Sequence, residues 1–103
     1  MIASAWTRGA LAAASLALAS FATAAEPIKL GEVASLTGKE AAFGQQAHRG
    51  IQMAIDEVNA RGGVLGRPLA IVSEDNQSKP GDSATIAKKL LSREKVIALI
   101  CTG

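Results

Sequence analysis

The spacing of apolar side chains changes along the chain and predicts alternating strands and helices. Residues 28–34 (IKLGEVA) form a short apolar-rich run that ends in the turn-like sequence 35–38, as expected for a strand followed by a loop. From Ala41 onward, apolar residues recur at helical spacing with polar residues mostly opposite them, until Gly62 and Gly63 end the pattern. This half of the region therefore predicts one strand and one amphipathic helix.

The second half repeats this order. Residues 68–74 (PLAIVSE) predict a strand, and Pro68 at its start suits an edge strand because proline has no N–H to donate to a ladder. Residues 75–82 are rich in turn-forming residues. A second amphipathic helix follows Pro80, with apolar positions at Ala84, Ala87, Leu90 and Leu91. Residues 96–101 are a continuous apolar run, which is typical of a strand covered on both faces.

This strand–helix–strand–helix–strand order predicts an α/β fold with a parallel sheet, because both helical segments are long enough for right-handed crossovers. It corresponds to half of a doubly wound domain. Ligands of such sheets bind outside the carboxyl ends of the strands, where the strand order reverses. We therefore expect a binding site at the loop of residues 35–44 and at the residues that follow Cys101.

Residues 1–25 have the layout of a secretory signal peptide. Arg8 precedes an apolar stretch over residues 9–21, and small residues follow at Ala22 and Ala24. The stretch is too short for a bilayer core of ~30 Å. We expect export to the periplasm, with cleavage after Ala24 or Ala25.

Composition and charge narrow the function further. The 103 residues are 49% hydrophobic and 19% charged, and the formal net charge is +2 with scattered Lys and Arg. These values argue against a disordered tail and against a nucleic-acid partner. A single cysteine, Cys101, cannot form an internal disulfide or a thiolate zinc cluster. We expect no metal and no cofactor.

The loop glycines do not match nucleotide-binding motifs. A dinucleotide fingerprint needs G-x-G-x-x-G, and Gly31, Gly38 and Gly44 lie too far apart. A phosphate-binding P-loop needs Ser or Thr after Gly-Lys, whereas Gly38-Lys39 is followed by Glu40. A nucleotide-binding α/β enzyme is therefore an alternative that the sequence disfavours.

Four residues remain candidates for other chemistry. Glu32 lies in the central first strand, where we favour a paired, hydrogen-bonded carboxylate over a general acid or base. His48 and Cys101 fit no Ser-His-acid arrangement and are interpreted as structural. Asp75 lies where a ribose-binding acid could follow the second strand, but without the glycines a turn or capping role is favoured. No enzymatic site is expected.

Residues 28–100 resemble the N-terminal stretch of the periplasmic leucine/isoleucine/valine-binding protein family, the type I solute-binding components of ABC importers. Three features carry the resemblance in this order: SLTG with AAFG after the first strand, AIDEVNARGGVLGRPL over residues 54–69, and the acidic turn Glu74-Asp75 followed by Pro80. Each piece is short, and their order and spacing together make the match specific.

The resemblance implies two α/β lobes that close over a small polar solute, often an amino acid, with amides and urea as further ligands. It also implies a membrane permease as partner. Residues 26–103 would be the N-terminal, incomplete part of the first lobe. The ligand-binding residues that it implies are Ser35, Thr37, Gly38, the aromatic cover Phe43, and Gly44 at the start of the helix.

The chain departs from the family at the end of the third strand. The family commonly has Gly there and, a few residues on, the Ser or Thr hydroxyls that bind the ligand head group, whereas this sequence reads Cys101-Thr102-Gly103. A shifted register would place Thr102 near a head-group position; the unshifted register, which the apolar run favours, leaves those hydroxyls beyond Gly103. The ligand-binding domain of a sensory receptor shares the fold and stays open as an alternative.

Overall fold

The computed structural model describes residues 25–102, so the signal peptide predicted over residues 1–25 lies almost wholly outside the described residues. The elements are β1 (Ile28–Ala34), α2 (Ala41–Ala60), β2 (Leu69–Asp75), the short 3-10 helix η1 (Pro80–Asp82), α3 (Ser83–Ser92) and β3 (Ala98–Thr102). The predicted order of strands and helices is confirmed.

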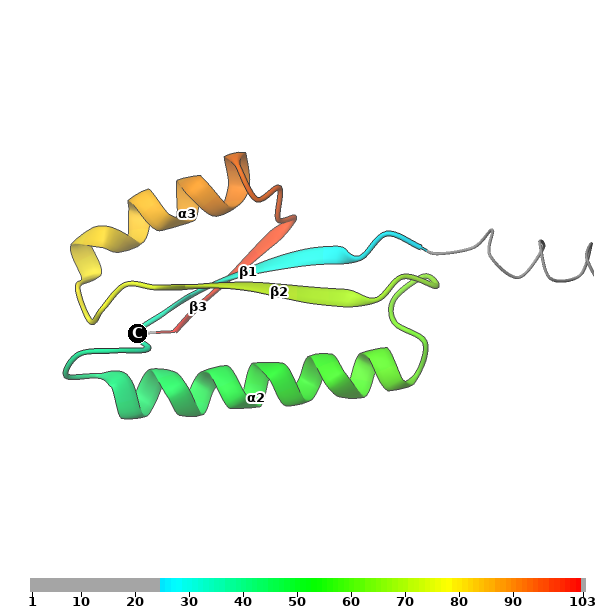
Figure 1. Cartoon of the computed structure of the whole chain (residues 1–103), viewed down its shortest axis with the longest axis horizontal. Helices are drawn as coiled ribbons and strands as arrows, with labels where there is room; N and C mark the ends of the chain where they lie inside the picture. Colours follow the sequence, from blue (N-terminus) through cyan, green and yellow to red (C-terminus); the bar gives the residue numbers. More distant parts are fainter. Residues whose placement is uncertain (1–24, 103) are drawn as a thin grey trace, which may run out of the picture.

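The three strands form one parallel sheet in the order β2-β1-β3. Helix α2 lies on one side of the sheet and α3 lies on the other (Figure 1). The chain first crosses from β1 to β2 on one edge and then from β2 past β1 to β3 on the opposite edge. This is the doubly wound α/β arrangement that the sequence predicted.

The apolar core lies between the sheet and α3. Val33, Leu90 and Val96 are buried there and pack with the partly buried Val72, Ile86 and Leu99. Gly31 gives α3 room to approach, since a Cβ on it would lie 2.8 Å from Leu99 Cδ2 and 3.2 Å from Leu90 Cδ1. Because successive strand residues face opposite sides, Gly31 and Val33 face α3 while Glu32 and Ala34 face α2.

Helix α2 ends where the glycine pair predicted. The N–H of Gly63 donates to the carbonyl of Val58 at 2.9 Å, and Gly62 and Gly63 have φ of 99° and 78°. Asn59, in the last turn, donates to the carbonyl of Leu69 and accepts from its N–H, which fixes the start of β2. No helix within residues 25–102 is long and apolar enough to cross a membrane.

The third strand differs from the prediction. It begins at Ala98 rather than Val96, and Ile97 is 71% exposed. Ala98 and Cys101 are also exposed, so β3 is not covered on both faces by the described part of the chain. Among residues 25–102, β3 pairs with β1 alone, and this leaves its outer edge without a neighbouring strand.

Candidate functional site

The carboxyl ends of the three strands meet at one edge of the sheet. Ala34, the last residue of β1, is in register with Asp75 of β2 and with Thr102 of β3. The chain continues from β1 to one neighbour and later returns to the other, so the strand order reverses beside β1. This is the place where open α/β sheets bind ligands.

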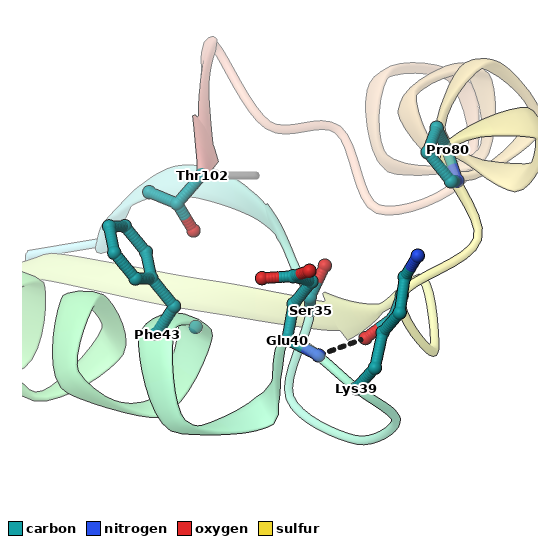
Figure 2. Close-up of a pocket in the computed structure, with 8 residues that line it drawn as sticks. Ser35, Lys39, Glu40, Phe43, Pro80 and Thr102 are labelled. Atoms are coloured by element: carbon teal, nitrogen blue, oxygen red, sulfur yellow. Dashed lines mark hydrogen bonds between the residues drawn. The ribbon is translucent and has the colours of Figure 1, made fainter.

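A cavity of about 390 Å³ lies at this edge. Its lining comes from the loop after β1, the first turn of α2, the turn after β2 and the end of β3. The lining residues are Ser35, Lys39, Glu40, Phe43, Gly44, Ser78, Pro80 and Thr102 (Figure 2). Of the five residues expected to bind ligand, Ser35, Phe43 and Gly44 therefore line one cavity, and Thr37 and Gly38 do not.

Phe43 and Gly44 form the wall that α2 contributes. The side chain of Phe43 is 75% exposed, and Figure 2 shows its ring rising from α2 toward Thr102. Gly44 lies against the end of β1, because a Cβ on it would lie 1.8 Å from the carbonyl oxygen of Ser35. An apolar ring standing over a close helix–strand contact can cover a small ligand.

Ser35 lies at the base of the cavity and is only 3% exposed. Its hydroxyl donates to Asn76 Oδ1 at 2.8 Å, so its proton is held within the protein. The hydroxyl oxygen keeps lone pairs that can accept a hydrogen bond. A direct contact between Ser35 and a ligand stays a prediction.

Thr37 and Gly38 shape the loop rather than the cavity wall. The Thr37 hydroxyl donates to Asp75 Oδ2 at 2.6 Å, and its N–H donates to Asp75 Oδ1 at 3.2 Å. Gly38 has a φ of +87°, and a Cβ on it would lie 2.7 Å from Ser78 Oγ. Their contact with a ligand also stays a prediction.

Asp75 has the turn role that the sequence favoured, since it accepts from the N–H of Gln77, and it also anchors the loop after β1, which the sequence did not indicate. Its carboxylate accepts from the N–H groups of Leu36, Thr37 and Gln77 as well as from the Thr37 hydroxyl. The Thr37 hydroxyl has the largest effect, and with the three N–H groups it outweighs burial and lowers the pKa of Asp75 from 3.8 to about 2. The carboxyl group is therefore charged throughout the neutral range.

Thr102 is the residue that the alternative register of the third strand would place near a ligand head group. It lines the cavity, and its Oγ1 is buried without a hydrogen-bond partner among the described residues. Buried polar groups are nearly always hydrogen-bonded. Glu32 Oε1, which lies outside the cavity, also has no partner among residues 25–102, and contact between Thr102 and a ligand stays a prediction.

Lys39 and Glu40 bring charge to the rim of the cavity. The ion pairs within residues 25–102 are His48–Glu32 and Lys89–Glu74, so neither Lys39 nor Glu40 is paired there. The N–H of Glu40 donates to Ser78 Oγ at 3.0 Å, and Figure 2 shows its carboxylate facing the cavity beside Ser35. Both charges are available to a polar solute.

Glu32 lies outside the cavity. It is fully buried, and its Oε2 accepts from Ser73 Oγ and from His48 Nδ1, each at 2.7 Å. The predicted paired carboxylate is confirmed. The described residues contain no group of three or more His, Cys, Asp or Glu side chains that could hold a metal ion.

Comparisons with known proteins identify the family. A family model described as periplasmic binding protein matches residues 27–102. The Leu/Ile/Val-binding protein BraC3 of Rhizobium johnstonii is 40% identical over 78 residues, which cover 76% of this chain and 21% of that protein. The Leu/Ile/Val-binding protein of Escherichia coli K12 is 34% identical over 97 residues, which cover 91% of this chain and 26% of that protein.

Solved structures share the fold. The branched-chain amino acid transporter substrate-binding protein LivJ from Streptococcus pneumoniae, in complex with isoleucine, matches with a TM-score of 0.68 and 36% identity over 71% of this chain and 21% of its own. The leucine-binding protein LivK from Thermotoga maritima matches with a TM-score of 0.61 and 30% identity over 70% of this chain and 20% of its own.

This chain thus spans between about a fifth and a quarter of these relatives. The match over residues 27–102, the parallel sheet and the sequence resemblance all agree. The chain belongs to the type I periplasmic binding protein family that includes the Leu/Ile/Val-binding proteins.

Proposed function

We propose that residues 26–103 form the N-terminal part of the first lobe of a solute-binding protein that serves an ABC importer. The protein captures a small polar solute, a branched-chain or other amino acid, and delivers it to a membrane permease. It binds its ligand without chemical change and is no enzyme. Because the chain spans only part of its relatives, the second lobe and the permease belong to this proposal.

The orphaned hydroxyl of Thr102 in the cavity carries the proposal. A buried hydroxyl without a partner favours a ligand that offers a carboxylate or an ammonium group, since such charged hydrogen bonds are the strong ones. Phe43 provides an apolar face for the rest of the solute. A cavity of about 390 Å³ falls within the ~300–1,000 Å³ range of small-molecule sites.

The contacts of Asp75 disfavour the nucleotide-binding alternative. A ribose-binding acid must offer free carboxylate oxygens to sugar hydroxyls. Both oxygens of Asp75 already accept hydrogen bonds from the loop after β1. Asp75 is therefore engaged in holding the loop and does not present the free carboxylate that a ribose would need.

The test is isothermal titration of the protein expressed from its complete gene with leucine, isoleucine, valine, other amino acids, acetamide and urea. Thr102→Val keeps the shape of the side chain and removes the hydroxyl. We expect it to weaken binding of the best ligand by about tenfold or more, as loss of a hydrogen bond to a charged group does.

Cys101→Ala is the matched control, since Cys101 is exposed, neighbours Thr102 on β3 and does not line the cavity. It should bind as the unaltered protein does. Binding of none of these solutes by the unaltered protein would refute the proposal. A membrane span encoded after residue 103 would favour the receptor alternative.

We further propose that the protein is exported to the periplasm and that residues 1–24 or 1–25 are removed. Arg8, the apolar stretch and the small residues at Ala22 and Ala24 support this. N-terminal sequencing of protein from osmotic-shock fluid should read from Ala25 or Glu26. An intact Met1 on cytosolic protein would contradict it.

A further inference from the structure

Hydrogen bonds to a distant segment of the chain hold the loop between β1 and α2. Ser35, Lys39 and Glu40, near the two ends of this loop, line the cavity, and residues 35–40 hydrogen-bond mainly to residues 75–78, about 40 residues later in the chain. We define residues 75–78 as the clasp.

Asp75 makes three of the six hydrogen bonds between this loop and the clasp, more than any other residue of the clasp. Its Oδ1 accepts from the N–H of Leu36 at 2.9 Å and of Thr37 at 3.2 Å, while its Oδ2 accepts from the Thr37 hydroxyl at 2.6 Å. Backbone N–H groups of an exposed loop would otherwise be satisfied by water in many arrangements. One carboxylate that binds two consecutive N–H groups and a side chain selects one of those arrangements.

Ser78 completes the clasp at its other end. Its hydroxyl donates to the carbonyl of Thr37 at 2.7 Å and accepts from the N–H of Glu40 at 3.0 Å. Gly38 fits closely beneath it, because a Cβ there would lie 2.7 Å from Ser78 Oγ and 2.8 Å from the carbonyl of Gln77. The loop and the clasp are therefore in direct backbone contact.

The backbone of the clasp is strained. Gln77 and Ser78 have φ of 56° and 59°, the left-handed region that non-glycine residues avoid. Asp75 accepts from the N–H of Gln77, and Asn76 Oδ1 accepts from the N–H of Ser78 at 3.0 Å, which stabilises this geometry. Strain of this kind persists where surrounding contacts enforce it and clusters at ligand sites.

We propose that Asp75 is the positioning residue of the cavity, whose carboxylate fixes residues 35–40 in the shape that the solute meets, so that this wall exists before binding. The inference rests on the proposed solute-binding function and adds the device that preorganises the site. Asp75 does not line the cavity and acts through the loop. Its lowered pKa agrees with this role, since the carboxylate stays charged at neutral pH.

Preorganisation has a kinetic signature. If loss of the carboxylate leaves the loop in the binding shape for only a fraction of the time, the apparent affinity falls by that fraction. The association rate constant then falls in proportion, and the dissociation rate constant changes little because bound solute orders the loop again. A residue that contacts solute directly would mainly raise the dissociation rate constant.

The experiment compares three variants of the protein expressed from its complete gene by stopped-flow binding of the best amino acid. We expect Asp75→Ala to lower the association rate constant by about tenfold, with dissociation changed by less than about twofold. Asp75→Asn should restore most of the rate, since its Oδ1 keeps the three N–H contacts and its amide can donate to the Thr37 hydroxyl. Glu74→Ala is the matched control, because Glu74 pairs with Lys89 away from the loop.

Hydrogen exchange by mass spectrometry supplies a readout that needs no ligand. Peptides covering residues 35–40 should exchange faster in Asp75→Ala than in Glu74→Ala, while the two variants should have the same melting temperature. Unchanged exchange there, or unchanged association in a variant that still binds solute, would overturn the inference. If the unaltered protein binds no solute, the proposed function fails, and the exchange result still decides whether Asp75 holds the loop.

Discussion

Replacing Gly44 with alanine tests how closely α2 approaches the end of β1. A Cβ at this position would lie 1.8 Å from the carbonyl oxygen of Ser35 and 2.6 Å from its carbonyl carbon. Both atoms belong to backbone, so no side chain can rotate away. The helix must retreat by roughly 1.6 Å to bring this distance to the 3.4 Å of ordinary contact, which is overpacking of the kind that costs about 1–3 kcal/mol.

The same substitution has an opposite intrinsic effect. In a helix interior, alanine is more favourable than glycine by about 1 kcal/mol. Gly50, which lies in the same helix with nothing within 4 Å of its Cβ position, isolates that gain. We therefore expect Gly50→Ala to stabilise the protein by up to about 1 kcal/mol and Gly44→Ala to destabilise it by up to about 2 kcal/mol.

Urea unfolding followed by far-UV circular dichroism measures both variants against the unaltered protein. The expected difference between them in the free energy of unfolding equals the overpacking cost, about 1–3 kcal/mol, because both share the intrinsic gain. Solute binding should also weaken in Gly44→Ala, since the wall beside Phe43 moves with the helix. Equal stabilisation by both substitutions would refute the close contact between α2 and β1.

Substitutions of three side chains test the cavity, the buried carboxylate and the loop after β1 separately. Phe43→Ala should weaken solute binding by about 1–3 kcal/mol in titration calorimetry, and the free energy of unfolding should change by less than about 0.5 kcal/mol because Phe43 is 75% exposed. Met53→Ala is the control, since Met53 is 64% exposed outside the cavity and its loss should change neither quantity. Equal losses of binding in both variants would argue against Phe43 as the cover of the ligand. Glu32→Ala should lower the free energy of unfolding by about 2–4 kcal/mol, since it leaves His48 and Ser73 without their acceptor. Glu40→Ala removes an exposed carboxylate and should change the free energy of unfolding by less than about 0.5 kcal/mol. Similar effects of the two substitutions would contradict the buried contact of Glu32. Because folding lowers the pKa of Asp75 from 3.8 to about 2, the stabilisation from its charged carboxylate is complete above pH 3.8 and is lost as the pH falls toward 2. The urea midpoint should therefore fall less steeply over that interval in Asp75→Asn than in the unaltered protein. Parallel curves for the two proteins would refute this pH dependence.

Local sequence pattern predicted most of the fold. The strand at residues 28–34 has the predicted bounds, and the helix that begins at Ala41 ends beside the glycine pair. Both depend on short-range spacing, which the sequence displays directly. The start of β3 does not depend on short-range spacing. Pairing of Leu30 with Ala98 determines where β3 begins, and the apolar Ile97 is left exposed before it.

The candidate site was predicted only in part for the same reason. Ser35, Phe43 and Gly44 lie near one another in sequence and line the cavity together. The contact between Thr37 and Asp75 joins residues 38 positions apart, and nothing in the spacing of either segment predicts it. Thr102 comes from the end of β3, far along the chain from the loop after β1, and pairing with Ala34 brings it to the same edge of the sheet. Its contact with a ligand depends on which of the two registers matches the family, and it stays a prediction.

The buried contact of Glu32 with His48 and Ser73 also limits how this sequence can change over generations. Loss of His48 or of Ser73 takes one hydrogen-bond partner from the fully buried Glu32 carboxylate, which costs about 1–3 kcal/mol. Joint replacement by well-packed apolar side chains of similar volume avoids that cost and is often neutral. The effect of a substitution at residue 32 therefore depends on which residues occupy positions 48 and 73. Related sequences should exchange the three together, although 16 and 41 positions separate the partners from Glu32.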